Sequence, residues 1–78
     1  MRQLLQYILS EITGNDNYTI EEREENGMLI FNIETEPENM GLIIGKNGKT
    51  IMSIQELVRV RGKIENTSVF VKVSEKFS

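Results

Sequence analysis

The chain has 78 residues, 38% of them hydrophobic, with a formal net charge of −3 and neither cysteine nor histidine. This length is sufficient for one small domain with a thin core, which we expect to span residues 1–78. The composition excludes disulfides, thiolate chemistry, the usual zinc ligands and the commonest general base, and no apolar run or signal peptide indicates a membrane segment.

The first part of the chain predicts one helix followed by two strands. Residues 1–13 have the apolar spacing of an amphipathic helix, which Gly14 ends. Residues 18–25 alternate weakly and predict an edge strand, whose glutamates discourage pairing between sheets. A dock for a basic partner is the alternative interpretation of these glutamates. Asn26-Gly27 is a strong hairpin-turn pattern, and residues 28–34 predict the second strand.

Two helices follow in the second half of the chain. Thr35 and Glu38 have the spacing of a capping box, which predicts that Thr35 caps a short helix running to about Ile44. A longer helix is expected from Lys49 to about Arg61, with Gly62 ending it. Apolar residues at helical spacing predict the core positions of these helices, which are Ile43, Ile54, Leu57 and Val58.

The order of elements predicts the fold class. Residues 69–73 alternate and predict the last strand, which completes the order α-β-β-α-α-β of an α+β fold. The last two strands are joined by a helical crossover and should therefore be parallel, whereas the first two form an antiparallel hairpin. We expect a three-stranded mixed sheet with three helices on one face.

The segment between the two helices of the second half carries the most informative pattern. Gly45 and Gly48 bracket a two-residue turn, and glycine lets bare backbone N–H groups approach a phosphate. The start of the following helix would add the positive end of its dipole. A mononucleotide-binding P-loop is excluded by spacing, because its first glycine would have to stand where the chain has Ile43. An ordinary helix–helix turn remains the alternative.

Residues 43–51, with the sequence IIGKNGKTI, resemble the signature loop of KH domains, which clamp single-stranded RNA. The approach to the loop, residues 37–41, and the stretch after it, residues 57–61, resemble the KhpA family of small bacterial KH proteins. That resemblance covers nearly the whole chain. The element order also resembles the bacterial, type II arrangement of the KH fold. Asn47 stands where many relatives carry glycine, at a variable position of the loop.

The resemblance implies binding of about four nucleotides of single-stranded RNA. The loop glycines would admit the sugar-phosphate chain, the two lysines would add charge, and Asn47 would contact RNA or only form the turn. Gly41, Ile44 and Ile51 would line the groove under the bases. The predicted RNA-binding residues are Gly41, Ile44, Gly45, Lys46, Asn47, Gly48, Lys49 and Ile51. No aromatic residue is close to the loop in sequence, so we expect little stacking.

The distribution of charge agrees with this interpretation better than the net charge does. Residues 1–40 carry a charge of −7, residues 41–63 carry +4, and residues 64–78 carry none. Screening hides charges beyond about 8–10 Å, so the local basic patch decides what binds there. We expect the acidic strand over residues 18–25 to lie away from the loop.

Two classes of function follow. The first is an RNA-binding protein, acting as an RNA chaperone or post-transcriptional regulator, whose partner is single-stranded RNA. The second is a protein-interaction subunit whose KH fold supports a homodimer, or a heterodimer with a larger KH protein, as the resemblance implies. Both interpretations predict a cytoplasmic protein with no enzymatic activity, no cofactor, no metal site and no membrane partner.

Overall fold

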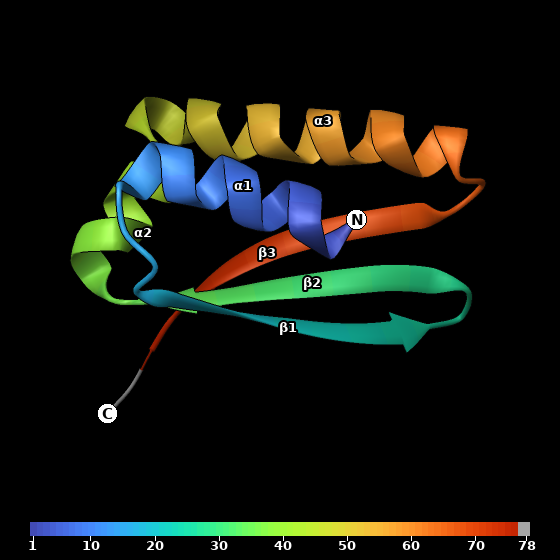
Figure 1. Cartoon of the computed structure of the whole chain (residues 1–78), viewed down its shortest axis with the longest axis horizontal. Coiled ribbons are helices and arrows are strands. Elements are labelled where there is room, and N and C mark those ends of the chain that lie inside the picture. Colours follow the sequence, from blue (N-terminus) through green and yellow to red (C-terminus); the bar gives the residue numbers. More distant parts are fainter. Residues whose placement is uncertain (77–78) are drawn as a thin grey trace.

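A computed structural model describes residues 1–76, and the arrangement of its elements is shown in Figure 1. The elements follow the predicted order α-β-β-α-α-β. Their bounds are α1 Arg2–Thr13, β1 Tyr18–Glu25, β2 Met28–Thr35, α2 Pro37–Ile44, the single 3-10 turn η1 Lys46–Gly48, α3 Lys49–Ile64 and β3 Ser68–Glu75.

The three strands form one mixed sheet in the order β1-β2-β3. β1 and β2 pair antiparallel through the Asn26-Gly27 turn, in which both residues have a positive φ. β2 and β3 pair in parallel, with Phe31 opposite Val71. The predicted hairpin and the predicted parallel crossover are both confirmed, and β1 and β3 are the two edge strands.

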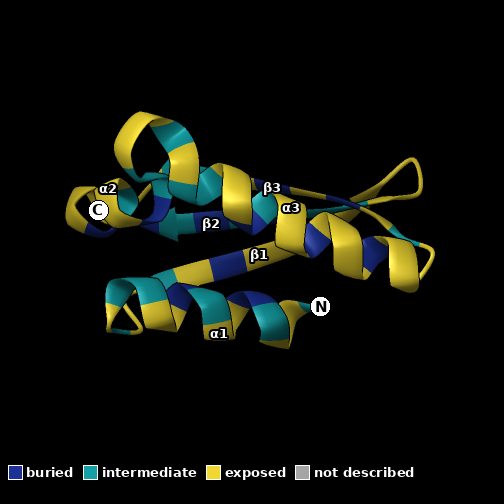
Figure 2. Cartoon of the chain, turned by 90° about the horizontal axis from the view of Figure 1, so that it is seen from above, coloured by how far each residue is buried: buried dark blue, intermediate teal, exposed yellow. Residues whose placement is uncertain are grey.

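The helices cover one face of this sheet, and the core lies between them (Figure 1). Alternate residues of the strands point into this layer, so that buried positions recur with period two along β2 and β3. Figure 2 shows the buried segments on the sheet-facing sides of α1 and α3. The apolar residues of the core are Leu5, Leu9, Ile20, Phe31, Ile33, Ile43, Ile54, Val58, Val69 and Val71. The predicted α+β fold with three helices on one face is confirmed.

The prediction that Thr35 caps α2 was wrong. Thr35 is the last residue of β2 and is buried, and its hydroxyl donates to the carbonyl oxygen of Asn17 at 2.8 Å. Glu36 occupies the cap position of α2 and makes no side-chain cap hydrogen bond. A buried hydroxyl must find an acceptor, and the start of the neighbouring strand supplies one that the sequence pattern does not reveal.

A polar cluster fixes α2 to the loop that precedes β1. The side chain of Asn39 is buried and donates to Asn15 Oδ1 at 2.9 Å and to the carbonyl oxygen of Asn17 at 3.2 Å. Asn15 returns a hydrogen bond to Asn39 Oδ1 at 3.2 Å. Because α2 leads directly into the glycine loop, this cluster also positions the loop.

The predicted end of α3 at Gly62 was also wrong, because the helix continues to Ile64. Gly62 is buried, and its amide oxygen accepts from the N–H of Thr67 at 2.7 Å. A Cβ at this position would contact the carbonyl oxygen of Thr67 and lie 3.1 Å from Val69 Cγ2. The glycine therefore permits a close approach of the chain, whereas the left-handed residue after the helix is Asn66, with φ 58°.

Leu57 was wrongly assigned to the core. Its side chain is 55% exposed, whereas its neighbour Val58 is fully buried. The buried positions of α3 are Ile54, Val58 and Gly62, which recur every four residues and define a narrow stripe. On a three-stranded sheet, one helix does not bury a wider stripe, and Leu57 lies about 100° away from Val58 around the helix axis.

Candidate nucleic-acid interface

The backbone of the glycine loop reverses the chain between α2 and α3 with three residues of positive φ, of which Asn47 and Gly48 are in the left-handed helical region. Gly45 has φ 76° and ψ 174°, Asn47 has φ 58° and ψ 27°, and Gly48 has φ 73° and ψ 13°. Asparagine is one of the few residues other than glycine that adopts this conformation readily. The departure from glycine at position 47 therefore costs the turn little.

Hydrogen bonding within the loop leaves two N–H groups available at its tip. The N–H of Gly45 donates to the carbonyl oxygen of Gly41 at 2.9 Å, and that of Gly48 donates to the carbonyl oxygen of Gly45 at 3.1 Å. The N–H groups of Lys46 and Asn47 donate to no acceptor among residues 1–76. The sixteen-residue helix α3 begins directly after them, without a side-chain cap. Free N–H groups and the positive end of a helix dipole together favour an anion.

Gly45 is constrained more tightly than Gly48. A Cβ on Gly45 would overlap the hydroxyl of Thr50 and lie 2.7 Å from Thr50 Cβ, whereas a Cβ on Gly48 would have no atom within 4 Å. Positive φ with ψ near 180° is in addition a region that essentially only glycine adopts. The loop thus packs closely against the first turn of α3 at its first glycine and is open at its second.

The three predicted groove residues lie on the helices that flank the loop. Gly41 and Ile44 are three residues apart on α2 and therefore share a face, where Gly41 is exposed and Ile44 is half-buried. A Cβ on Gly41 would meet no atom within 4 Å, so this face is open. Ile51 is half-buried in the first turn of α3 and packs against the core. Ile43, in contrast, is fully buried, as predicted.

Both predicted loop cations are exposed, as is Asn47. Neither Lys46 nor Lys49 forms an ion pair within residues 1–76. Figure 1 shows α2 and the start of α3 at one end of the molecule and the β1–β2 turn at the other. The glutamates near the end of β1 are thus separated from the loop along the longest dimension, which is 34 Å.

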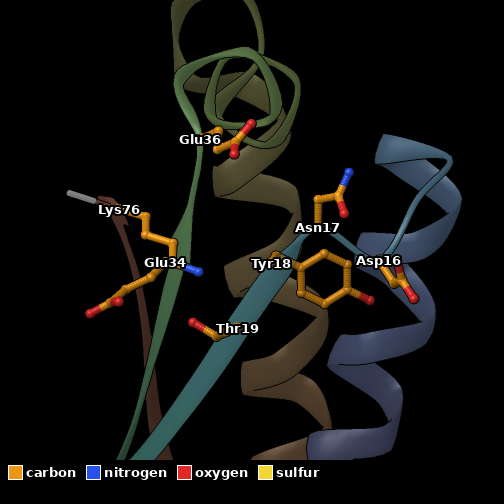
Figure 3. A pocket seen from close by; sticks show the side chains of 7 residues that line it. All are labelled: Asp16, Asn17, Tyr18, Thr19, Glu34, Glu36 and Lys76. Atoms are coloured by element: carbon orange, nitrogen blue, oxygen red, sulfur yellow. The ribbon is translucent and has the colours of Figure 1, made fainter. Parts of the chain in front are cut away.

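A polar cavity of about 360 Å³ lies beside the starts of β1 and α2 (Figure 3). Its charged residues are Asp16, Glu34, Glu36 and Lys76, three carboxylates against one ammonium. The excess negative charge repels a phosphate. Within residues 1–76 no group of three acidic residues is arranged to hold a metal ion. This cavity is therefore less suited to an anion than the glycine loop is.

A family model described as KhpA/KhpB, KH domain, matches residues 2–73. The chain belongs to the KhpA/KhpB KH-domain family. It is 28% identical to the RNA-binding protein KhpA of Clostridium acetobutylicum over 74 residues, covering 94% of this chain and 99% of that protein. It is 34% identical to the RNA-binding protein KhpA of Thermotoga maritima over 59 residues, covering 74% of this chain and 79% of the relative.

A similar fold occurs in a crystal structure of an Era variant from Aquifex aeolicus bound to GDP and AlF4−. The TM-score is 0.64 and the sequence identity 20%, and the match covers 95% of this chain but only 29% of Era. This likeness concerns the fold alone. Among residues 1–76 of the present chain, no helix is long and apolar enough to span a membrane.

The sequence directed attention to the loop but not to a group of side chains beyond it. Arg59 and Lys63 belong to the basic segment, but no motif assigns them a site, and Phe70 is distant from the loop in sequence. The structure brings these three residues to one cavity at the far end of α3. The sequence signal that could have found this group is the spacing of the two cations, which stand four residues apart on a helix.

Proposed function

We propose that this chain binds single-stranded RNA through the loop Gly45–Gly48 and the adjoining face of α2 and α3. The observation that carries the proposal is the pair of free N–H groups at Lys46 and Asn47, placed before the N-terminus of α3 and beside two exposed lysines. Membership of the KhpA/KhpB family, in which two relatives are named RNA-binding proteins, supports it. The eight site residues predicted from the sequence are proposed as the contacts.

Each part of the loop would have a separate role. The N–H groups of Lys46 and Asn47 donate to phosphate oxygens, and Gly48 leaves room for the sugar-phosphate chain because no side chain projects there. The ammonium groups of Lys46 and Lys49 add charge. The bases then lie against Gly41, Ile44 and Ile51. A role as an RNA chaperone or post-transcriptional regulator in the cytoplasm belongs to the same proposal, as does the absence of enzymatic activity.

The decisive experiment replaces Lys46→Asp and Asn47→Asp together. Both positions are exposed, and aspartate tolerates the left-handed conformation of Asn47, so the free energy of unfolding should change by no more than about 0.5 kcal/mol per position. Two carboxylates beside the phosphates should weaken RNA binding at least tenfold, about 1.4 kcal/mol. The matched control is Lys76→Glu with Gln3→Glu, which makes the same change in net charge at exposed positions outside the loop.

RNA affinity is measured by fluorescence anisotropy, and folding by thermal unfolding. A folded loop variant that binds RNA as tightly as the unsubstituted chain would refute the proposal, as would an equal loss of RNA affinity in the control.

The logarithm of the affinity should also fall with the logarithm of salt concentration. Neutralising two to four phosphates gives a slope of about −1.4 to −2.8, at roughly −0.7 per phosphate.

A second function, protein association, is favoured by one specific observation. Leu57, Val60 and Ile64 are 55%, 58% and 74% exposed and stand three and four residues apart, so they share a face of α3. We infer that this apolar face is the contact for a second copy of the chain or for a larger KH protein. One module of this size contacts few phosphates, and association of two modules would raise the affinity for RNA through effective concentration.

The test of this second function is the molecular mass of the chain in solution. If the exposed face of α3 forms the contact, Leu57→Ser with Ile64→Ser should lower the mass measured by light scattering to that of one chain. Exchanging the exposed residues Ser53→Thr and Arg61→Lys on the same helix is the control. A monomeric unsubstituted chain at all accessible concentrations would refute self-association and leave only a different partner.

A further inference from the structure

A second cavity lies on the free edge of the sheet, at the opposite end of α3 from the glycine loop. Its volume is about 300 Å³. The last two turns of α3 contribute Arg59 and Lys63, and the chain after the helix contributes Thr67, Ser68 and Phe70. Because the strand order is β1-β2-β3, this edge of β3 has no neighbouring strand within residues 1–76. The cavity is therefore accessible along the length of an unpaired strand.

The two cations of this cavity lack partners, in contrast to the other arginines of the described chain. Arg59 and Lys63 are exposed and form no ion pair within residues 1–76. Arg61, on the same helix, is paired with Glu65 at 2.7 Å. Two unpaired positive charges four residues apart on one helix face form a local site for a polyanion.

An aromatic ring completes the cavity. Phe70 is 40% exposed, on the face of the sheet that carries no helix, and it stands opposite Ile30 in the β2–β3 register. The side chain of Met28, also 40% exposed, lines the same cavity. A cavity lined by both an exposed ring and two cations suits single-stranded nucleic acid, since bases can stack on the ring and phosphates can contact the cations.

The cavity is connected to the loop by one side of α3. Lys49, Glu56, Arg59 and Lys63 follow one another along this side, and a hollow of about 270 Å³ lined by Lys49, Met52, Ser53 and Glu56 occupies the first half of it. At 1.5 Å per residue, Arg59 lies about 15 Å and Lys63 about 21 Å along the axis from Lys49. Glu56 interrupts the positive charge, so a polyanion would be held at the two ends of α3 and not along its middle.

We propose that this cavity is a second subsite for the same RNA, holding nucleotides beyond the four at the glycine loop. A base stacks on Phe70, and the phosphates beside it contact Arg59 and Lys63. The inference depends on the proposed function of the loop and extends it, because it predicts that affinity increases with RNA length. It also revises the sequence-based expectation that stacking is unimportant in this chain.

The experiment compares oligouridines of about four and about ten nucleotides, lengths that fill the loop alone and both sites. The unsubstituted chain should bind the longer RNA at least tenfold more tightly. Phe70→Leu keeps an apolar side chain but removes the ring, and it should weaken binding of the longer RNA at least fivefold without changing that of the shorter. Arg59→Gln with Lys63→Gln should reduce the salt slope for the longer RNA by about 1.4, at 0.7 per phosphate.

Each other outcome identifies what has failed. Equal affinity for the two lengths overturns the second subsite but leaves the loop proposal intact. The same holds if Phe70→Leu leaves the affinity for the longer RNA unchanged. The second subsite is also overturned if Phe70→Leu lowers the affinity for both RNA lengths equally, because Phe70 then acts through the fold or through the glycine loop. Binding of both lengths that survives Lys46→Asp with Asn47→Asp refutes the loop proposal itself. A poly-glutamate peptide that binds at Arg59 and Lys63 more tightly than the longer RNA would make the cavity a protein-docking site.

Discussion

Replacing Gly45 by alanine tests whether the first glycine of the loop is fixed by packing as well as by backbone conformation. The substitution places a methyl group against the side chain of Thr50, with Thr50 Cβ at 2.7 Å. It also forces a non-glycine residue into φ 76° and ψ 174°. Gly48→Ala is the matched comparison, because its φ is 73° but its Cβ would meet no atom within 4 Å.

The two contributions can be estimated separately. A non-glycine residue in a sparsely populated region costs about 1–3 kcal/mol, and forcing a methyl group into occupied space costs typically about 1–3 kcal/mol more. We therefore expect Gly45→Ala to lower the free energy of unfolding by about 2–6 kcal/mol. Gly48→Ala should lower it by about 1–2 kcal/mol, the cost of the left-handed conformation alone. At about 4–8 °C per kcal/mol for a domain of this size, Gly45→Ala should lower the Tm by at least about 8 °C.

Urea unfolding of the two variants, with Thr50→Ala and the double variant Gly45→Ala/Thr50→Ala, measures the part of the packing cost that comes from the Thr50 hydroxyl, because alanine keeps the Cβ that lies at 2.7 Å. Alanine has the highest helix propensity, so Thr50→Ala is harmless to α3. The double variant should be more stable than the sum of the single effects predicts, by at least about 0.5 kcal/mol, because it removes the hydroxyl that the new methyl group meets. Equal destabilisation by Gly45→Ala and Gly48→Ala, together with additivity in the cycle, would refute the close contact between loop and helix.

Two further predictions concern α3. Leu57→Ala should change the free energy of unfolding of the monomer by no more than about 0.5 kcal/mol, because the side chain is 55% exposed, whereas Ile54→Ala, at 1% exposure, should cost about 2–5 kcal/mol. Urea unfolding at low protein concentration measures both, and a larger effect at Leu57 than at Ile54 would contradict the assigned core stripe. Gly62→Ala should destabilise the fold despite the high helix propensity of alanine, because the new Cβ meets the carbonyl oxygen of Thr67. A stabilised Gly62→Ala variant in thermal unfolding would show that the helix end moves away at little cost.

The fold was predictable because local patterns and connectivity point to the same answer. Apolar residues that alternate over residues 28–34 and 69–73, the Asn26-Gly27 turn and the helical crossover define a mixed sheet without reference to any contact. The placement of the glycine loop was predictable for the same reason, since it lies between two helices whose apolar positions repeat.

Two of the errors arose where a residue contacts a partner outside its own turn or helix. Thr35 has the spacing of a cap but donates to Asn17, and Gly62 has the position of a helix stop but accommodates Thr67. The cavity at Phe70 was missed for the same reason, because only the parallel pairing of β2 and β3 and the path of α3 bring Met28, Phe70 and Lys63 together. Distances along the chain do not contain that information.

The three faces of α3 would allow so small a chain to carry the separate functions proposed for it. Ile54, Val58 and Gly62 face the core, Arg59 and Lys63 face the free edge of β3, and Leu57, Val60 and Ile64 face solvent. Successive residues are about 100° apart around the axis, so a substitution on one face leaves the side chains of the other two in place. Stability, RNA length dependence and association should therefore respond to different substitutions of the same helix. If stability, RNA length dependence and association change together in every variant, the helix acts as one unit and the assignment of separate faces is wrong.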